Sequence, residues 1–385
     1  MRNFSQNINP YYSKNEYLKV LHVVLSLEPG GMENGVVNVS RILHGNGFII
    51  YVCCLERAGD FAVRFPNKEG IFVLNKPPGL SFKTILKLSE VIRKIRPDIV
   101  HTHNFGPLIY TTAAKFISPS FKLLHGEHGM IKPEDNTKFK IGLRKFCYKQ
   151  CDLIHTVSCG LKDYFVNLGF PPKKILPVFN GVDTEKFKPE YKLAVRRELN
   201  LPENAIILGV VGRFDRGKRH RELIEAFNNM ADNFKNVYLL FVGDGGTDCN
   251  QVKEMANRSP YRERIIFAGY QRNMAPYYQA MDILIIPSLK EGFPNVLLEA
   301  MACGIPALAH PTPGTSETIT DGKDGFLRNL ESVDMICESV KEVISDLNRI
   351  KFLGECARQK VQTQFSLQKM ANDYADVYRN LCYGN

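Results

Sequence analysis

Short apolar runs alternate along this chain with longer segments whose apolar residues recur at helical spacing. In the first half the apolar runs cover residues 18–27, 48–54, 71–74, 98–102, 121–126 and 152–158. Segments such as 81–96 lie between these runs, and their apolar residues recur every three or four positions, as on one face of a helix. This alternation predicts βαβ units, in which helices connect the parallel strands of one sheet.

The pattern begins again after a stretch near residues 184–203 that is rich in proline and charged residues. Further apolar runs cover residues 205–212, 237–243, 264–268, 282–287 and 305–309. The predicted fold class is therefore α/β, with two Rossmann-like, doubly wound domains at residues 1–190 and 191–365. Residues 366–382 carry an apolar stripe, so a final helix near 366–385 is expected to pack back on the first domain.

The two halves of the chain differ in net charge. Residues 1–190 hold 26 Lys and Arg against 16 Asp and Glu, whereas residues 191–385 hold 24 of each kind. A one-sided charge favours an anionic partner for the first half, such as nucleic acid, a phospholipid surface or a phosphorylated acceptor. A solvated basic surface without a partner is the alternative.

The sequence also predicts where the chain resides. Residues 1–15 are polar and lack an apolar core, which predicts no secretory signal, and no apolar run is long enough for a membrane span. The ten cysteines show no C-x-x-C spacing and are expected to be reduced thiols of a cytoplasmic protein.

Two cations follow the run 205–212. Arg213 and Lys218 lie in the segment GRFDRGK, and a helical pattern begins near Arg219. Ligands of open parallel sheets bind at the carboxyl ends of strands, where guanidinium and ammonium groups can pair with phosphates. The segment predicts a diphosphate site, with a solvated loop end as the alternative.

The segment KEGFPNVLLEAMACG at residues 290–304 predicts a second anion site. Pro294 suits the first turn of a helix, because its missing N–H would be unpaired there. The backbone N–H groups of Asn295 and Val296 then lie at a helix N-terminus, which attracts anions.

Glu291 and Glu299 lie on one side of that helix. Carboxylates accept hydrogen bonds, so the hydroxyl groups of a sugar or ribose are natural partners. Two glutamates on a helix surface are the alternative, but Glu299 interrupts the apolar run VLLEAMA, where an unpaired charge would be costly.

In the first half, Gly30 and Gly31 follow the run 18–27, and adjacent glycines let the backbone approach a ligand closely. Their spacing does not match a dinucleotide fingerprint. His101 and His103 end the strand near 98–102, and His128 follows the run 121–126. Histidines at strand ends can bind sugar hydroxyls or respond to charge at a reacting carbon, although ordinary core histidines are the alternative.

Taken together, these motifs resemble glycosyltransferase family four, a large retaining family with the GT-B fold. The resemblance extends from Gly30 to the final helix. Its most specific part is Glu291 to Glu299 with the continuation LLEAMACGIPALA, which is similar to the E-x7-E motif of the family. The loop GGMEN, the segment GEHG, the pair Arg213 and Lys218, and the turn FVGDGG occur in the family's order.

The resemblance implies which domains and residues would bind the donor and the acceptor. Domain 1–190 would bind the acceptor and domain 191–365 the nucleotide-sugar donor. The residues implied in donor binding are Gly30, Gly31, Arg213, Lys218, Phe293, Pro294, Asn295, Val296 and Glu299. The cations would hold the diphosphate and Glu299 the ribose, whereas the catalytic residues would be Glu291, at the transferred sugar, and His128, near the anomeric carbon. Glu33 and His103 would lie on the acceptor side.

The resemblance further implies a front-face displacement through an oxocarbenium-like state, with no metal and no cofactor. The favoured donor is a UDP-sugar and the next a GDP-mannose, while the segment EGFPN, which replaces the EGFGL of many members, leaves the sugar open. The acceptor would be a glycan or a lipid-linked sugar in polysaccharide synthesis. A nucleotide-sugar epimerase, a phosphorylase of similar architecture and a nucleic-acid binder are the rival hypotheses.

A basic and aromatic segment at residues 132–149 suits an anionic membrane surface, so peripheral association with the inner membrane face is expected. Its cations and aromatic residues are Lys132, Lys138, Lys140, Arg144, Lys145, Lys149, Phe139, Phe146 and Tyr148. An ordinary basic helix is the alternative.

Overall fold

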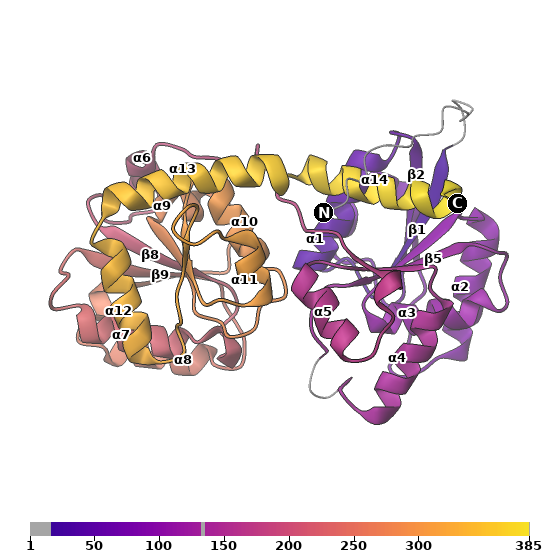
Figure 1. Ribbon diagram of the computed structural model, residues 1–385, viewed down its shortest axis with the longest axis horizontal. Helices are drawn as coiled ribbons and strands as arrows, with labels where there is room; N and C mark the ends of the chain where they lie inside the picture. The colour runs from indigo at the N-terminus through magenta and orange to yellow at the C-terminus, as the bar shows by residue number, and fades with distance from the viewer. Residues whose placement is uncertain (1–16, 132–134, 385) are drawn as a thin grey trace. The chain divides into compact units, whose positions relative to one another are not determined.

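The computed structural model describes residues 17–131 and 135–384, and its core consists of two parallel sheets with helices around them (Figure 1). The prediction for residues 1–15 lies outside the described residues, as does Lys132. Among the described residues, no helix combines the length and the apolar composition that crossing a bilayer requires. Cys53, Cys54 and Cys303 are buried free thiols.

The first sheet has seven strands in the order β3-β2-β1-β4-β5-β6-β7. These are β1 (Leu18–Val24), β2 (Phe48–Cys54), β3 (Ile71–Val73), β4 (Ile99–His103), β5 (Lys122–Glu127), β6 (Leu153–Thr156) and β7 (Ile175–Pro177). The connecting helices are α1 (Gly31–Leu43), α2 (Phe82–Ile95), α3 (Phe105–Lys115), α4 (Lys138–Gln150) and α5 (Cys159–Asn167).

The second sheet has six strands in the order β10-β9-β8-β11-β12-β13. These are β8 (Ile206–Val211), β9 (Val237–Val242), β10 (Ile265–Gly269), β11 (Ile283–Ile286), β12 (Ala307–Ala309) and β13 (Phe326–Leu327). Its helices are α6 (Lys192–Glu198), α7 (His220–Met230), α8 (Cys249–Arg258), α9 (Ala275–Ala280), α10 (Asn295–Ala302), α11 (Pro313–Thr318), α12 (Val333–Ile344) and α13 (Leu347–Gln364). An apolar core fills the space between this sheet and helices α7 and α12, which pack on each other.

The predicted α/β class and the two doubly wound sheets are confirmed. Each predicted apolar run overlaps a strand of the structure. Ser81 begins the predicted helix near 81–96, because its side chain accepts a hydrogen bond from the backbone N–H of Thr84 and so caps α2.

Each sheet has a switch point, where the strand order reverses. In the first sheet β1 pairs in parallel with both β2 and β4, and in the second sheet β8 pairs with both β9 and β11. The connections therefore leave the two central strands in opposite directions, which opens a crevice beyond their carboxyl ends. The segments that follow β1, β4, β8 and β11 are the ones that can line such a crevice.

The final helix, α14 (Leu367–Tyr383), returns to the first sheet as predicted. The hydroxyl group of Tyr378 lies 2.9 Å from Nδ1 of His101 on β4. The guanidinium group of Arg379 stacks over the ring of Phe48 on β2, 5.2 Å from its centre. The C-terminal residues thus cover the middle of the first sheet (Figure 1).

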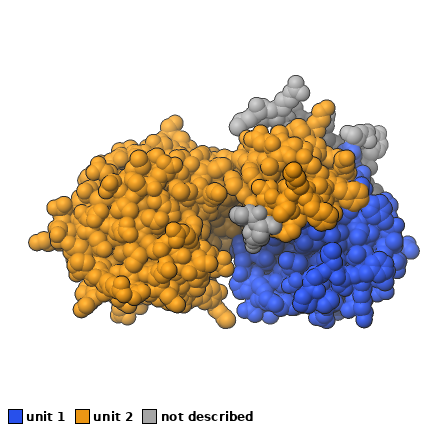
Figure 2. All heavy atoms as spheres, turned by 90° about the horizontal axis from the view of Figure 1, so that it is seen from below, with its two compact units in different colours: residues 1–125, 150–152, 378–385 blue, residues 126–149, 153–377 orange. Residues whose placement is uncertain are grey.

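The chain divides into two compact units, which Figure 2 colours separately. Unit 1 comprises residues 1–125, 150–152 and 378–385, and unit 2 comprises residues 126–149 and 153–377. The division at residue 190 between an acceptor domain and a donor domain stays a prediction.

Candidate active site

The loop after β8 carries the two predicted phosphate-binding cations. A short 3-10 turn, Arg216–Lys218, follows the strand, and α7 begins directly after it. Arg213 is 76% exposed and makes an ion pair with Asp215, with 2.8 Å between Nη2 and Oδ2. Arg213 therefore points into solvent from the carboxyl end of a central strand.

Two glycines let neighbouring loops meet backbone to backbone. Gly243 has a φ of 143°, and a Cβ at this position would collide with the carbonyl oxygen of Gly212. A Cβ at Gly246 would collide with the backbone of Phe214. The segment FVGDGG thus supports the loop that carries Arg213. The sequence indicated only that this segment is a turn typical of the family.

Lys218 and Glu291 form an ion pair. Their Nζ and Oε1 atoms are 2.5 Å apart, and both side chains are partly buried, at 35% and 12% exposure. Lys218 follows β8 and Glu291 follows β11, which are the two central strands of the second sheet. The structure therefore brings a predicted phosphate ligand and a predicted sugar ligand together at the switch point.

Helix α10 begins at Asn295, and Pro294 stands at the N-cap rather than within the first turn. Phe293 is buried, with its ring 5.6 Å from that of Phe179 and 5.9 Å from that of Phe365. Its side chain thus packs in an aromatic cluster, and a donor contact would come from its backbone. The side chain of Asn295 accepts a hydrogen bond from Asn180, at 2.9 Å. Val296 is half-buried beside it.

Glu299 lies one helical turn deeper in the second sheet's domain. Its carboxylate accepts a hydrogen bond of 2.7 Å from the hydroxyl group of Tyr278, which is completely buried. Burial raises the pKa of Glu299 to about 7, and the hydrogen bond from Tyr278 opposes that rise. The sequence predicted that this carboxylate needs a partner, but it did not identify Tyr278.

The glycine loop after β1 leads directly into α1, and Gly30 stands at its N-cap. Glu33 lies in the first helical turn, and its carboxylate lies over Gly30, where a Cβ would collide with it. Partial burial raises the pKa of Glu33, against the effect of a backbone hydrogen bond. A carboxylate thus lies at the α1 N-terminus, close to the place predicted for a phosphate at Gly31.

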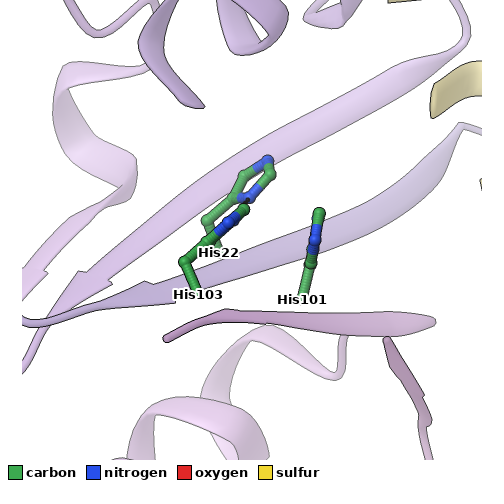
Figure 3. Close-up of side chains that lie close together, drawn as sticks. All are labelled: His22, His101 and His103. Atoms are coloured by element: carbon green, nitrogen blue, oxygen red, sulfur yellow. Dashed lines mark hydrogen bonds between the residues drawn. The ribbon is translucent and has the colours of Figure 1, made fainter. Parts of the chain in front are cut away.

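Three histidines gather at the switch point of the first sheet. His22 on β1 lies opposite His101 on β4 in the register, and His103 follows two residues later, so all three point to the same face (Figure 3). Their ligand nitrogens lie within 4.8 Å of one another. Three imidazole nitrogens at this spacing could hold a metal ion, so a reaction without a metal stays a prediction. The sequence did not single out His22, which lies in an ordinary apolar run.

His128 follows β5, and its ring meets the buried ring of His155 edge to face at 5.7 Å between centres. Gly126 makes room for this pair, because a Cβ there would collide with His155. A Cβ added to Gly292 would lie 3.7 Å from the carbonyl oxygen of His128. The segments that carry His128 and Glu291 therefore come within contact distance.

Two residues of the segment 132–149 were predicted to contact a membrane surface, and this prediction is wrong for them. The side chains of Arg144 and Tyr148 are buried and both contact the carboxylate of Glu127, with 2.5 Å between the Tyr148 hydroxyl and Oε1. These contacts anchor α4 to the end of β5, because a buried charge needs a partner of opposite sign. Phe139 and Phe146 are exposed, as are Lys138 and Lys149.

Known proteins resemble this chain over nearly all of its length. The family model described as "Glycosyltransferase Family 4" matches residues 29–186, and that described as "Glycosyl transferases group 1" matches residues 192–360. The D-inositol 3-phosphate glycosyltransferase of Kribbella flavida is 30% identical over 373 residues, which are 87% of each protein.

A UDP-Gal:alpha-D-GlcNAc-diphosphoundecaprenol alpha-1,3-galactosyltransferase of Escherichia coli is 24% identical over 388 residues, covering 95% of this chain and 98% of that protein. Among solved structures, HepE of Anabaena in complex with UDP-glucose has a TM-score of 0.82 and 20% identity, with 94% of this chain and 99% of that chain covered. The likeness to HepE concerns the fold.

Proposed function

Since this chain belongs to glycosyltransferase family 4, we propose that it transfers a hexose from a nucleoside diphosphate sugar to an acceptor, with retention at the anomeric carbon. The observation that carries the proposal is the pairing of Lys218 with Glu291 at the switch point of the second sheet. A phosphate ligand and a sugar ligand are both needed there, because the bond that breaks lies between a phosphate oxygen and a sugar carbon.

The donor diphosphate binds to Lys218 and Arg213 and to the N-terminus of α10. Arg213 is exposed and close to the same strand end, so its guanidinium can turn from Asp215 to a phosphate oxygen. The N-terminus of α10 adds backbone N–H groups and the positive end of the helix dipole. Glu299, beside Tyr278, then accepts hydrogen bonds from the ribose.

In the transfer, the bond between the anomeric carbon and the diphosphate oxygen breaks. A bond to the acceptor oxygen forms on the same face, and the acceptor proton passes to the departing diphosphate. Lys218 and Arg213 stabilise the negative charge that grows on the leaving group, so the protein supplies the charge that a metal supplies elsewhere. Glu291 holds hydroxyls of the transferred sugar and His128 lies at the anomeric carbon; no metal or cofactor takes part.

The proposed donor is a UDP-sugar, with GDP-mannose as the second choice. The relative from Escherichia coli is named for a UDP-galactose donor and a lipid diphosphate acceptor, and HepE binds UDP-glucose. A glycan or lipid-linked acceptor at the inner face of the membrane fits the net charge of the chain, which is +10. The exposed cations and aromatic rings of α4 would contact anionic lipid, and Glu33 and His103 would face the acceptor.

A melting-temperature panel of nucleotide sugars, read in excess chelator, tests the donor, because a ligand of the native state raises the melting temperature. The anomeric configuration of the product, measured by NMR, then tests retention. A stabilising donor whose sugar appears unchanged in configuration on an acceptor supports the proposal. A product epimerised without an acceptor, or a released sugar phosphate, would refute it in favour of an epimerase or a phosphorylase.

A further inference from the structure

Tyr278 and Glu299 join helices α9 and α10 through a hydrogen bond. The hydroxyl oxygen of Tyr278 lies 2.7 Å from Oε2 of Glu299. Tyr278, on α9, is completely buried, whereas Glu299, on α10, is half-buried. A ligand can therefore reach the carboxylate but not the hydroxyl group, so Tyr278 can act on a ligand only through Glu299.

The packing around α9 holds the ring of Tyr278 in place. The ring of Phe187 meets it edge to face, with 5.9 Å between the ring centres. The next residue, Gln279, donates a hydrogen bond of 2.8 Å from its side-chain amide to the carbonyl oxygen of Lys188. These contacts fix α9 against the segment that leads into α6, so the Tyr278 hydroxyl is presented to the carboxylate from a rigid support.

In this hydrogen bond the hydroxyl group donates and the carboxylate accepts. Burial raises the pKa of Tyr278 well above its ordinary value, so its oxygen keeps the proton and donates it to Oε2. Within residues 17–131 and 135–384, Tyr278 is the single hydrogen-bond donor to Glu299. A carboxylate accepts through both oxygens, so Oε1 keeps its capacity for the hydroxyl groups of a ligand.

The groups around Glu299 balance its charge near neutral pH. Burial opposes the charged form, while the hydrogen bond from Tyr278 and the positive charge of Lys186 favour it. Cys303, at the C-cap of α10, stays a neutral thiol, because burial raises its pKa to about 12. Arg358, on α13, lies near Cys303 and donates a hydrogen bond to the last carbonyl group of α10. The pKa of Glu299 that results is about 7, so its charge changes within the neutral range.

We propose that Tyr278 is a positioning residue that holds the ionised carboxylate of Glu299 by Oε2 and leaves Oε1 to accept a hydrogen bond from the donor ribose. This role rests on the proposed function, which places the ribose at Glu299. A protonated carboxyl group is a weaker acceptor than a carboxylate, so a proton and the donor compete for this side chain. Donor binding should therefore weaken as the pH falls, and Tyr278 sets the pH at which it weakens.

Titration calorimetry of the full-length protein over a range of pH tests this role. The probe is UDP-glucose, or GDP-mannose if the wild type binds that donor instead, because neither diphosphate diester gains a proton near neutral pH. For the wild type we expect the affinity to fall about tenfold between pH 8 and pH 6, as the ionised fraction of Glu299 does. Tyr278→Phe should move the midpoint of this fall upward by about one pH unit or more, since the ionised form loses a hydrogen bond.

Two further variants complete the experiment. Glu299→Gln should abolish the fall, because an amide does not titrate. Tyr277→Phe removes a half-buried hydroxyl group from the same helix and should keep the wild-type midpoint. The same midpoint in Tyr278→Phe and in the wild type would overturn the role of Tyr278, whatever the stability of the variant. A donor that binds the wild type equally at every pH would overturn this inference alone, whereas a wild type that binds neither donor would refute the proposed function as well.

Discussion

The ammonium group of Lys218 lies 2.5 Å from the carboxylate of Glu291, although 73 residues separate the two in the chain. In the proposed reaction the cation binds a phosphate and the carboxylate binds the sugar. Donor binding must therefore exchange a carboxylate for a phosphate at Lys218. The exchange releases Glu291 toward the sugar, so diphosphate binding and sugar recognition are coupled through one ion pair.

Replacing Glu291 by glutamine separates these two functions. We expect turnover to fall about 100-fold or more, because an amide holds the sugar hydroxyls less strongly as charge develops. The affinity for UDP should stay the same or rise a few-fold, since Lys218 no longer has to leave a carboxylate. Steady-state kinetics and titration calorimetry measure the two quantities.

Glu254→Gln is the matched control for this variant. Glu254 lies on α8 in an exposed ion pair with Arg258, so its loss should leave both turnover and UDP affinity at wild-type values. A Glu291→Gln enzyme with a near-normal rate, or one with much weaker UDP binding, would be incompatible with the coupling.

Arg213→Ala should weaken the binding of free UDP about 10- to 100-fold, the usual effect of losing a charge-assisted hydrogen bond. Asp215→Asn should act in the opposite direction, because it removes the carboxylate that pairs with Arg213 in the free protein. Calorimetry checks both variants, with Arg258→Ala as an exposed arginine control. Equal affinities for wild type and Arg213→Ala would remove Arg213 from the site.

Glu299 makes the stability depend on pH in a defined direction. Its pKa is raised from 4.5 to about 7 by burial, so the folded protein binds a proton that the unfolded chain has already released. Its contribution to the free energy of unfolding therefore falls as pH rises from about 4.5 to about 7, and stays constant above. Glu299→Gln lacks this change, so it should be more stable than the wild type by up to ~3 kcal/mol at pH 8 and equal to it near pH 4.5.

Urea unfolding of both proteins across this pH range measures the difference. Glu263→Gln, at a side chain that is 86% exposed, provides a control that should differ from the wild type by a constant amount. A Glu299→Gln protein that is less stable than the wild type at pH 8 would show that the charged carboxylate is stabilising there.

The sequence was sufficient to predict most of the strands, but not β7 and β13. Strands β8 and β9 have six residues each, nearly all apolar, and the chain changes to helical spacing after them. Strands β7 and β13 have three and two residues, and no apolar run of the sequence analysis covers them. Their place in the sheets depends on pairing with β6 and β12, and such contacts are not encoded locally.

The site was predictable to the level of strand ends. Arg213 and Glu291 follow strands that the apolar pattern identified, so their shared location follows from the topology of parallel sheets. Contacts between distant side chains were not predictable. The burial of Arg144 against Glu127 is an example, because a basic helix with aromatic residues has the same composition whether or not one arginine turns inward.

This correction narrows the predicted membrane surface to the outer face of α4, where Phe139 is 79% and Phe146 is 49% exposed. Replacing both by serine should lower binding to vesicles with phosphatidylglycerol at least about 100-fold, because each buried aromatic ring contributes roughly 1.5–3 kcal/mol. Added salt should also weaken wild-type binding, since it screens the attraction of Lys138 and Lys149 to anionic lipid. Phe116→Ser, at a ring that is 66% exposed beside α3, is the control and should bind like the wild type. Sedimentation with the vesicles measures all four cases, and equal binding by the double variant and the wild type would exclude α4 as the contact.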